Sequence, residues 1–329
     1  MRICSTCVLP ESFPGIEFDA KGRCNHCRAQ QGVTARSGGE QRLSELIAEH
    51  HGQADYDALV AFSGGKDSSY VLYLLRRRYD LRLLALTFDN GFIPETAWRN
   101  TRAVTEALGI DHLVFRPAFG LLRRLFAGAA QGDHFPPVAL QRASAICTAC
   151  MSLVKLTTWR ESMLRRIPFV VYGWSPGQAP PAGALFRHNP EMLHLMEEAQ
   201  LDPLRSILDE EVEQYRIPAH LRDDPERMPY HVNLFGLLPY DEAAATAALA
   251  ELGWQRPPDT DPNSTNCQLN TLANLLHRKR YGYHPYAFEL AQLVRQGYLA
   301  REEALARLEP EEDPARARAV AERLGIRLS

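Results

Sequence analysis

The sequence contains no long apolar run. No stretch of its 329 residues approaches the roughly 18 consecutive apolar residues that a membrane-spanning helix requires, which excludes a helical membrane protein. The first residues, MRICSTC, also lack the apolar segment of a secretory signal. Together these absences predict a cytoplasmic protein with no membrane partner. In such a reducing compartment, cysteines serve as metal ligands or catalysts more often than as disulfides.

The chain also lacks an excess of positive charge. Its 37 lysine and arginine residues are outnumbered by 40 aspartate and glutamate residues, so the formal net charge is −3. Affinity for a phosphate backbone comes from clustered basic side chains, and this balance therefore argues against a protein that coats nucleic acid. A small-molecule or nucleotide-linked substrate is expected rather than tRNA.

Four of the seven cysteines lie within the first 27 residues. Cys4, Cys7, Cys24 and Cys27 have the spacing C-x2-C-x16-C-x2-C, in which two tight turns each present a pair of thiolates to one point. A closed shell of four sulfurs is typical of structural zinc, with iron as the alternative, and leaves no open position for catalysis. His26 is expected to be a bystander because four thiolates already fill the shell.

The stretch DYDALVAFSGGKDSSYVLYLLRRR predicts a buried strand over 58–62, a glycine turn and an amphipathic helix. In the turn, Gly64 and Gly65 permit a backbone path that side chains would block, and the N–H groups at the helix start can bind phosphate oxygens. The turn has neither the Walker A spacing nor the G-x-G-x-x-G of dinucleotide-binding folds. A glycine turn before an ordinary helix is the structural alternative.

Three further strands are expected in LRLLALTFDNGF, DHLVFRP and PFVVYGWSPGQ, with a helix in TAWRNTRAVTEALGI. This alternation predicts an α/β fold with a parallel sheet, in which ligands bind at the carboxyl ends of the strands. Ser63, Asp89 and Gly173 fall at such ends, so Asp89 and the loop GWSPGQ are candidate contacts for nucleotide or substrate. For Asp89, the alternative role is a cap for the turn DNG.

The segment SGGKDS, residues 63–68, resembles the PP-loop motif S-G-G-x-D-S of the ATP pyrophosphatase superfamily. This resemblance implies the adenine nucleotide α-hydrolase-like, Rossmann-like fold and a reaction that adenylates a substrate oxygen and releases pyrophosphate. It implies that the pyrophosphate of ATP is held by Ser63, Gly64, Gly65, Asp67 and Ser68. By the same resemblance, Lys66 faces the α-phosphate and Asp67 helps to hold magnesium.

The order of features over most of the chain resembles the N-acetyl sugar amidotransferase family. These features are the four-cysteine segment, AFSGGKDSS, TFDNGF, NLFGLLPYDE with ELGW, and the tail RKRYGYHPYAFELAQLVRQGYLAREEAL. The resemblance implies conversion of a carbonyl of an acylated, nucleotide-linked sugar toward an amidine, with ATP and with ammonia from a partner glutaminase. That chemistry needs no thiolate, whereas this chain has a second Cys-x-x-Cys pair.

Three cysteines remain, Cys147 and Cys150 in AICTACMSLVK and Cys267 in NSTNCQLN. They resemble the set with which PP-loop tRNA thiolation enzymes hold a [4Fe–4S] cluster, leaving one iron free to bind sulfide. A helix beginning near Cys147 is also expected to lower its thiol pKa through the helix dipole. The alternatives are a persulfide and resolving pair, zinc with a fourth ligand such as His277 or His284, and buried cysteines acting as small hydrophobes.

These features predict three regions: a four-cysteine zinc knuckle over 1–35, a PP-loop ATP-binding α/β domain over 36–240, and a helical C-terminal region over 241–329. Residues 177–235 are expected to form irregular loops and short helices over the active-site mouth. In the last region, YDEAAATAALAELGW predicts a helix that begins at an Asp cap and stops at Gly253. Whether the chain forms a homodimer is open.

The expected activity is ATP-dependent sulfur transfer. Its candidate catalytic residues are Lys66, Asp67, Cys147, Cys150 and Cys267. With magnesium, ATP would adenylate a carbonyl or carboxylate oxygen, and sulfur from sulfide or a persulfide carrier would then displace AMP. Lys155 is either a cation for the adenylate or a surface lysine. Amidotransfer with a glutaminase partner is the competing expectation, and a regulatory protein that binds ATP without turnover is the third.

Overall fold

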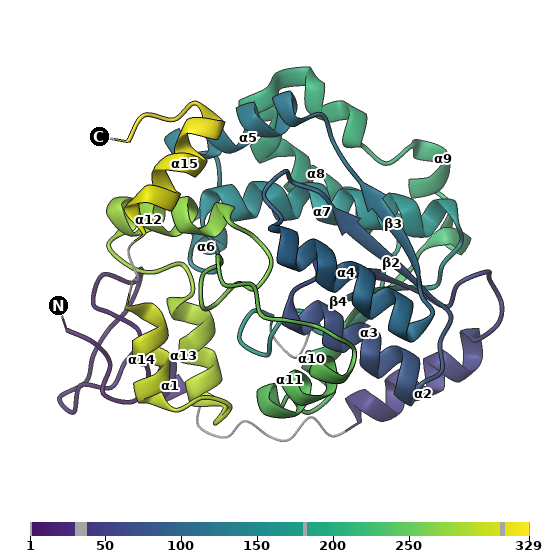
Figure 1. Ribbon diagram of the computed structural model, residues 1–329, viewed down its shortest axis with the longest axis horizontal. Helices are drawn as coiled ribbons and strands as arrows, with labels where there is room; N and C mark the ends of the chain where they lie inside the picture. Colours follow the sequence, from purple (N-terminus) through teal and green to yellow (C-terminus); the bar gives the residue numbers. More distant parts are fainter. Residues whose placement is uncertain (1, 30–37, 180–182, 310–312, 329) are drawn as a thin grey trace.

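The structure is a computed structural model that describes residues 2–29, 38–179, 183–309 and 313–328. Its centre is a six-stranded sheet with the order β3-β2-β1-β4-β6-β5 (Figure 1). The strands are β1 (Ala58–Ala61), β2 (Leu83–Phe88), β3 (Asp111–Phe115), β4 (Phe169–Tyr172), β5 (Leu185–Arg187) and β6 (Tyr230–Asn233). Neighbouring strands from β3 to β6 run parallel, and β5 pairs antiparallel with β6 at the edge.

The central strands are apolar along their whole length. β1 reads ALVA, β2 reads LLALTF and β4 reads FVVY, and every residue of β2 and β4 is buried. Such strands do not alternate between apolar and polar residues because helices cover both faces of a parallel sheet. The four strands predicted from the sequence, and the parallel α/β fold class, are confirmed.

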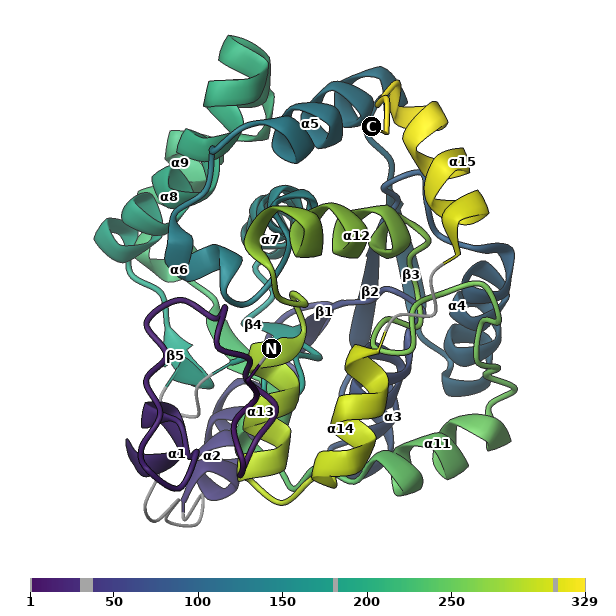
Figure 2. The same cartoon turned by 90° about the vertical axis from the view of Figure 1, so that its left-hand side faces the viewer.

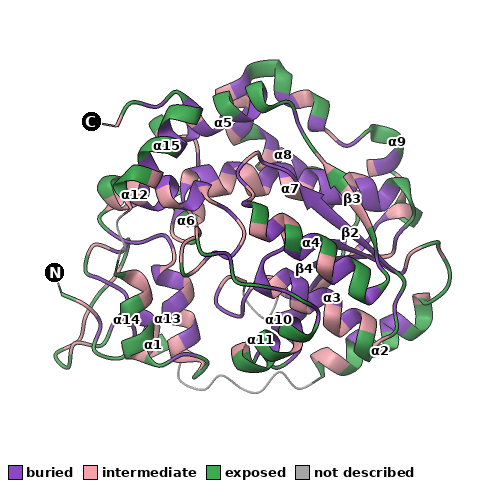
Figure 3. Ribbon diagram, viewed as in Figure 1, coloured by how far each residue is buried: buried purple, intermediate pink, exposed green. Residues whose placement is uncertain are grey.

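Alternate residues of β4 belong to two different hydrophobic cores, one on each face of the sheet. Figure 3 shows the central strands as buried and the surrounding helices as partly buried and partly exposed. One core is completed by α2 (Gly39–His50), α3 (Lys66–Arg78), α4 (Glu95–Leu108), α10 (Leu234–Leu237) and α11 (Glu242–Glu251). The other is completed by α5 (Phe119–Gln131), α6 (Pro137–Leu140), α7 (Ala145–Leu164), α8 (Pro190–Leu208), η2 (Asp209–Tyr215) and α9 (Ala219–Arg222). No helix in the described ranges is both long enough and apolar enough to cross a membrane.

The expectation of irregular loops and short helices over 177–235 is wrong. This segment contains the 19-residue helix α8 and the strands β5 and β6, which extend the sheet beyond β4, besides the short η3 (Pro225–Arg227). α8 packs against α5 and α7 (Figure 2). Its two prolines suggested a loop, but Pro190 lies in the first turn, where a missing N–H costs nothing, and Pro203 is tolerated within the helix.

Asn189 caps α8, and its replacement tests whether a helix begins at Pro190. Its Oδ1 accepts a hydrogen bond from the N–H of Met192 at 2.8 Å. Asn189→Ala should therefore lower the free energy of unfolding by about 1 kcal/mol, whereas Asn189→Ser, which keeps a capping oxygen, should cost much less. Urea unfolding of the two variants measures the difference, and equal stabilities would contradict the assigned helix start.

The helical C-terminal region is confirmed. Besides α11, it contains α12 (Leu269–Tyr281), α13 (Ala287–Arg295), α14 (Arg301–Leu308) and α15 (Pro314–Leu324). α11 is the helix predicted in YDEAAATAALAELGW, and its cap, Asp241, accepts from the N–H groups of Ala243 and Ala244. The predicted boundary at 240/241 falls between α10 and α11, and the one at 35/36 lies outside the described residues.

The N-terminal cysteine segment packs against α13 and α14 (Figures 1 and 2). The ring of Phe13 stacks on Phe288 with 5.8 Å between centroids. Arg301 donates hydrogen bonds to the carbonyl oxygens of Cys7 and Cys4 at 3.1 and 2.9 Å. Although residues 4–27 and 281–308 are far apart in sequence, they share one hydrophobic core.

Candidate active site and metal centre

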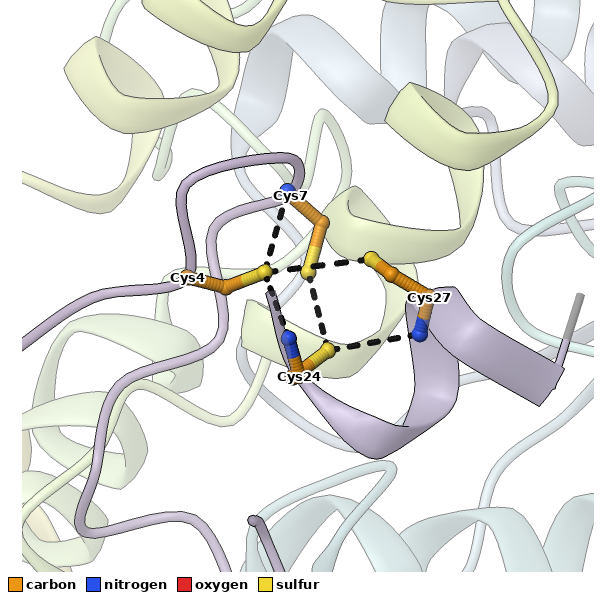
Figure 4. A group of neighbouring side chains, drawn as sticks. All are labelled: Cys4, Cys7, Cys24 and Cys27. Carbon is orange, nitrogen blue, oxygen red and sulfur yellow. Dashed lines mark hydrogen bonds between the residues drawn. The ribbon is translucent and has the colours of Figure 1, made fainter. Parts of the chain in front are cut away.

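The four N-terminal cysteines converge on one point (Figure 4). The Sγ atoms of Cys4 and Cys27, and those of Cys7 and Cys24, are 3.8 Å apart, and all four lie within 4.8 Å of one another. Zinc–sulfur bonds of about 2.3 Å in a tetrahedron place the sulfurs about 3.8 Å apart. The four thiols therefore form a site of the right size for one metal ion.

Backbone N–H groups support the sulfurs of this site. Cys4 Sγ accepts from the N–H groups of Thr6, Cys7 and Cys24 at 3.4, 3.5 and 3.2 Å. Burial acts to raise the pKa of Cys4, but these donors outweigh it and lower the pKa to about 7. His26 packs edge-on against Phe13 and Phe288 and is not among the clustered ligands. One thiol of the set is thus prepared for deprotonation before any metal binds.

The segment of residues 63–68 follows β1 and includes the first turn of α3; because the sequence predicts that it binds ATP, it is called the nucleotide loop. Ser68 Oγ closes it, because it accepts from the N–H of Ser63 at 3.2 Å and lies 3.1 Å from Ser63 Oγ. Gly65 is the N-cap residue of α3, so the first N–H groups of that helix open toward the loop. Gly173, at the carboxyl end of β4, lies against the backbone of Ser68. The loop is therefore a preformed cradle at the carboxyl edge of the sheet, as the sequence predicts.

Gly64 is the position at which this loop has no room for a side chain. Its φ is +73°, and an added Cβ would lie 2.6 Å from Ala97 O and 2.8 Å from Thr101 Cγ2. Gly64→Ala should therefore displace the loop and weaken MgATP binding at least tenfold, which corresponds to about 1.4 kcal/mol. Trp254 provides the readout by fluorescence, since its Nε1 donates to Gly64 O at 2.9 Å.

Gly52→Ala is the matched control for that prediction. Gly52 also has a positive φ, +80°, but nothing lies within 4 Å of an added Cβ. It should show the backbone strain alone, about 1–2 kcal/mol of stability, with unchanged nucleotide affinity. Wild-type affinity in Gly64→Ala would contradict the assignment of this loop to the nucleotide.

Three side-chain oxygen atoms surround the Nζ atom of Lys66. Its Nζ donates to Tyr240 Oη at 2.5 Å and lies 3.0 Å from Asp67 Oδ1 and 3.3 Å from Glu242 Oε1. Tyr240 in turn donates to Asp67 Oδ1 at 2.7 Å. Lys66 and Asp67 thus lie together at the start of α3. If Lys66 binds the α-phosphate as predicted, it would give up its contact with Asp67 or Glu242.

Asp89 is engaged on both oxygens. Oδ1 accepts from the N–H of Gly91 at 2.9 Å, which is the turn cap considered from the sequence, and Oδ2 accepts from Arg116 Nε at 2.6 Å. The next residue, Asn90, points the other way. Its Nδ2 donates to Cys267 Sγ at 3.3 Å and lies 3.7 Å from Cys150 Sγ. Asn90 is therefore the residue of this turn that contacts the second set of thiols.

The three remaining cysteines are brought together from two distant segments. Cys147 and Cys150 lie in the first turns of α7, and Cys267 precedes α12. Asn90 bridges two of them, and the Cys147 thiol donates to Asn270 Oδ1 at 3.0 Å. The sequence prediction that this pair and the single cysteine meet in one place agrees with these contacts.

The segment that carries Cys267 lies directly on the nucleotide loop. Thr265 Oγ1 accepts from the N–H of Lys66 at 2.9 Å, and an added Cβ at Gly65 would meet Thr265 and Asn266. The N–H of Gln268 binds the carbonyl of Phe92, in the turn that follows Asn90. The thiols and the nucleotide loop are therefore neighbours in a single site.

The expected lowering of the Cys147 pKa is wrong. α7 begins at Ala145, and its cap Ser144 accepts from the N–H of Cys147. Burial nevertheless raises the pKa of Cys147 to about 12 and also raises the pKa values of Cys150 and Cys267. The loss of hydration outweighs the helix dipole, because a thiolate in an apolar setting without a cation is costly. A positive partner is needed before these thiols ionise.

The geometry distinguishes the two cysteine sets. Among the described residues, the three Sγ atoms of the second set do not all lie within 4.8 Å of one another, in contrast to the N-terminal four. One zinc ion would require about 3.8 Å. His277, packed on Tyr281 and Tyr283, and His284, whose Nδ1 accepts from the N–H of Tyr286, do not join the trio. As they lie among the described residues, the three thiols are therefore not spaced for a single zinc ion.

Another group of possible ligands, His194, Glu197 and Glu198, is explained by ion pairs. Glu197 is fully buried and pairs with Arg216 and Arg222. Its Oε1 accepts from the N–H of Ile217. Since arginines already balance its charge, nothing in this group points to a metal.

Lys155 is half-buried. Its Nζ lies 5.7 Å from the centroid of the Trp174 ring, just beyond the carboxyl end of β4. Burial lowers its pKa. The side chain therefore brings a cation to the edge of the sheet where the nucleotide loop and the thiols meet.

Five further residues of this site were not singled out from the sequence: Asn90, Tyr240, Thr265, Asn270 and Glu289. Each lies in a segment that carries a resemblance or a cysteine, namely TFDNGF, NLFGLLPYDE, NSTNCQLN and the tail. Asn90 and Thr265 could have been predicted as site residues because they lie next to Asp89 and near Cys267 in the sequence. Tyr240 and Glu289 have no such signal, because their roles depend on contacts with Lys66 and Ser175, more than 100 residues away.

No protein-family model matches the chain. An uncharacterised protein of Methanocaldococcus jannaschii is 24% identical over 259 residues, which cover 79% of this chain and 74% of that protein. A U34-tRNA thiolase of Methanococcus maripaludis, solved with its [4Fe–4S] cluster, aligns at 15% identity with a TM-score of 0.37, over 100% of this chain and 90% of the thiolase. An NMN synthetase of Francisella tularensis aligns at 12% identity with a TM-score of 0.36, over 90% of this chain and 98% of the synthetase.

An NH3-dependent NAD synthetase of Campylobacter jejuni also aligns, at 14% identity with a TM-score of 0.32, over 69% of this chain and 87% of the synthetase. All three TM-scores lie below 0.5. The function proposed below is therefore argued from the contacts within this chain.

Proposed function

We propose that this protein is an ATP-dependent sulfurtransferase of the PP-loop type, which adenylates a carbonyl or carboxylate oxygen and replaces that oxygen with sulfur. The observation that carries the proposal is the contact between the Cys267 segment and the nucleotide loop through Thr265 and Lys66. Asn90 bridges Cys150 and Cys267, and Asn270 contacts Cys147, which supports a site where three thiols lie near a loop suited to phosphate. Nitrogen transfer would have no use for thiols at that place.

The nucleotide would bind at the start of α3. The loop N–H groups and Ser63, Gly64, Gly65, Asp67 and Ser68 would hold the pyrophosphate of ATP. Lys66 would exchange a carboxylate for the α-phosphate, where it offsets the charge that develops at phosphorus. Asp67 would hold magnesium, which supplies further charge stabilisation when bound.

The second thiol set fits a [4Fe–4S] cluster. Its three sulfurs do not all lie within 4.8 Å of one another among the described residues, which is wider than one zinc ion allows. Cys267 is buried and Cys147 and Cys150 are half-buried, and because desolvation raises the pKa of all three thiols, a cationic partner would favour their ionisation. Cys147, Cys150 and Cys267 would hold the cluster, and the Asn90 amide would donate to the sulfurs of Cys150 and Cys267 from outside. When bound, such a cluster has one iron without a protein ligand and can present sulfide there.

The remaining residues would position the substrate. Lys155, beneath Trp174, brings positive charge to the adenylate from the β4 side. The N-terminal four cysteines would bind zinc in a closed structural site that takes no part in the reaction. The acceptor is proposed to be a small or nucleotide-linked molecule, and sulfide or a persulfide carrier the sulfur source.

One experiment tests this function. Anaerobically reconstituted protein, with zinc and iron counted, is incubated with MgATP, sulfide or ammonium, and either a UDP-linked N-acetyl sugar or an unmodified tRNA transcript. We expect a coloured protein with about four irons and one zinc per chain and acceptor-dependent release of pyrophosphate and AMP with sulfide. A colourless protein that turns over with ammonium would identify an amidotransferase, for which a glutaminase partner is then expected. ATP binding without pyrophosphate release would indicate a regulatory protein.

A further inference from the structure

Glu289, on α13, places a carboxylate against the loop that follows β4. Its Oε1 accepts a hydrogen bond from Ser175 Oγ at 2.6 Å. Its Oε2 is buried and has no hydrogen-bond partner within residues 2–29, 38–179, 183–309 and 313–328. A carboxylate that only anchors the Ser175 loop needs one oxygen. A second buried acceptor without a donor is unfavourable, so it indicates a proton or a ligand group that completes the site.

The position of Glu289 is closely restrained. An added Cβ at Gly177 would lie 2.3 Å from the carbonyl oxygen of Glu289 and 2.9 Å from its Cγ, so the loop after β4 and α13 are in backbone contact. On the other side, Phe288 packs into the core of the N-terminal cysteine segment. α13 is held from both sides, and the carboxyl group has little freedom to turn away.

The charged groups that face Glu289 come from three elements. Lys66 and Asp67 act on it from the start of α3, and Glu289 in turn acts on Tyr240, before α11, and on Tyr286, at the start of its own helix. Burial is the main cause that raises the pKa of Glu289 to about 7; Asp67 adds to this rise, whereas the side chains of Ser175 and Gln178 and the charge of Lys66 oppose it. Tyr286 is also electrostatically coupled to Cys147. Glu289 thus interacts electrostatically with Lys66 and Asp67 on one side and with Tyr286 on the other.

We propose that Glu289 is the proton-transfer residue of this site, with Oε2 facing the bound substrate. The proposal rests on the adenylation chemistry above and concerns its second half. As the nucleophile attacks the adenylated carbon, its S–H or N–H bond breaks and the proton passes to Oε2. A C–S or C–N bond forms, the C–O bond to AMP breaks, and its electron pair leaves with AMP. The proton then returns to solvent. Sulfur and nitrogen nucleophiles both require this step.

Two variants separate this role from a structural one. Glu289→Gln keeps an oxygen for Ser175 and has nearly the same shape, but it cannot take a proton. Ser175→Ala removes the anchoring hydrogen bond and keeps the carboxyl group. If Glu289 only holds the loop, Ser175→Ala should be the more harmful change. If Glu289 transfers a proton, Glu289→Gln should be the more harmful change.

The first measurement needs no acceptor. Calorimetric titration of the full chain with MgATP, in buffers of different ionisation enthalpy at pH 7, gives the protons taken up on binding. Because phosphate charges arrive near a half-ionised carboxyl group, wild type should take up roughly half a proton more than Glu289→Gln. In Ser175→Ala, the pH of greatest uptake should rise, since a donor that favours the carboxylate is lost. Equal uptake by wild type and Glu289→Gln would overturn the proposal.

The second measurement uses the acceptor and donor that support turnover in the experiment above. In a single turnover, Glu289→Gln should release pyrophosphate at nearly the wild-type rate and release AMP about 10²- to 10⁴-fold more slowly. Normal AMP release by this variant would refute the role of Glu289 and leave the proposed function standing. Failure of wild type to bind MgATP in the titrations would instead refute the proposed function.

Discussion

Replacing Cys267 with alanine is expected to abolish sulfur transfer while ATP binding persists. Cys267 is the distant member of the three-thiol set and is held by Asn90. Loss of an outer-shell partner commonly reduces metal affinity or activity by 10- to 100-fold, so loss of a direct ligand should exceed about 100-fold. Thr265, whose hydroxyl contacts the N–H of Lys66, is unchanged in this variant. Sulfur incorporation, iron content and Trp254 fluorescence with MgATP measure these effects separately.

Two further variants calibrate this result. Met151→Leu conserves volume next to Cys150 on the same helix and should leave transfer nearly unchanged. Asn90→Leu removes the amide that bridges Cys150 and Cys267, and it should give an intermediate loss of about 10- to 100-fold. A Cys267→Ala protein that transfers nitrogen from ammonium at the wild-type rate would contradict sulfur transfer and favour amidotransfer.

Removing the metal from the N-terminal site is expected to destabilise both ends of the chain together. The four cysteines belong to one core with Tyr283, Phe288 and Leu290, and Arg301 binds the carbonyls of Cys4 and Cys7. Chelation or Cys24→Ser should reduce the free energy of unfolding by about 3–5 kcal/mol. This loss should lower Tm by on the order of 5–10 °C. Hydrogen exchange should show lost protection in α1 (Asn25–Ala29), α13 and α14, with the central strands unaffected.

Ser5→Ala is the control for the metal-site variant. Ser5 is exposed between two ligands, and its hydroxyl donates to the carbonyl of Lys21, so its loss should cost little. If chelated protein keeps its Tm and its protection in α13, the four-cysteine segment folds without metal. In that case its N–H···S hydrogen bonds and the Phe13–Phe288 contact suffice.

The sequence predicts elements well where one local pattern decides. β1, β2 and β4 are continuous apolar segments because both faces of the sheet are covered. α4 ends at Gly109, which has a φ of +62°, as expected of a glycine cap. α8 and β6 were missed because Pro190, His231 and Asn233 are typical of loops. His231 nevertheless packs between the rings of Tyr172 and Phe186 inside the protein.

The sequence by itself determined which chemistry is available: a glycine loop before a helix, a closed set of four cysteines and a remainder of three. Spacing within a few residues is enough for these, because a turn or a helix start places such groups whatever the rest of the chain does. Only the tertiary structure decided that Thr265 lies on Lys66, that Asn90 bridges two thiols and that Glu289 keeps an oxygen without a donor. It also decided the sign of the Cys147 pKa shift, because burial by distant segments outweighs the dipole of the local helix.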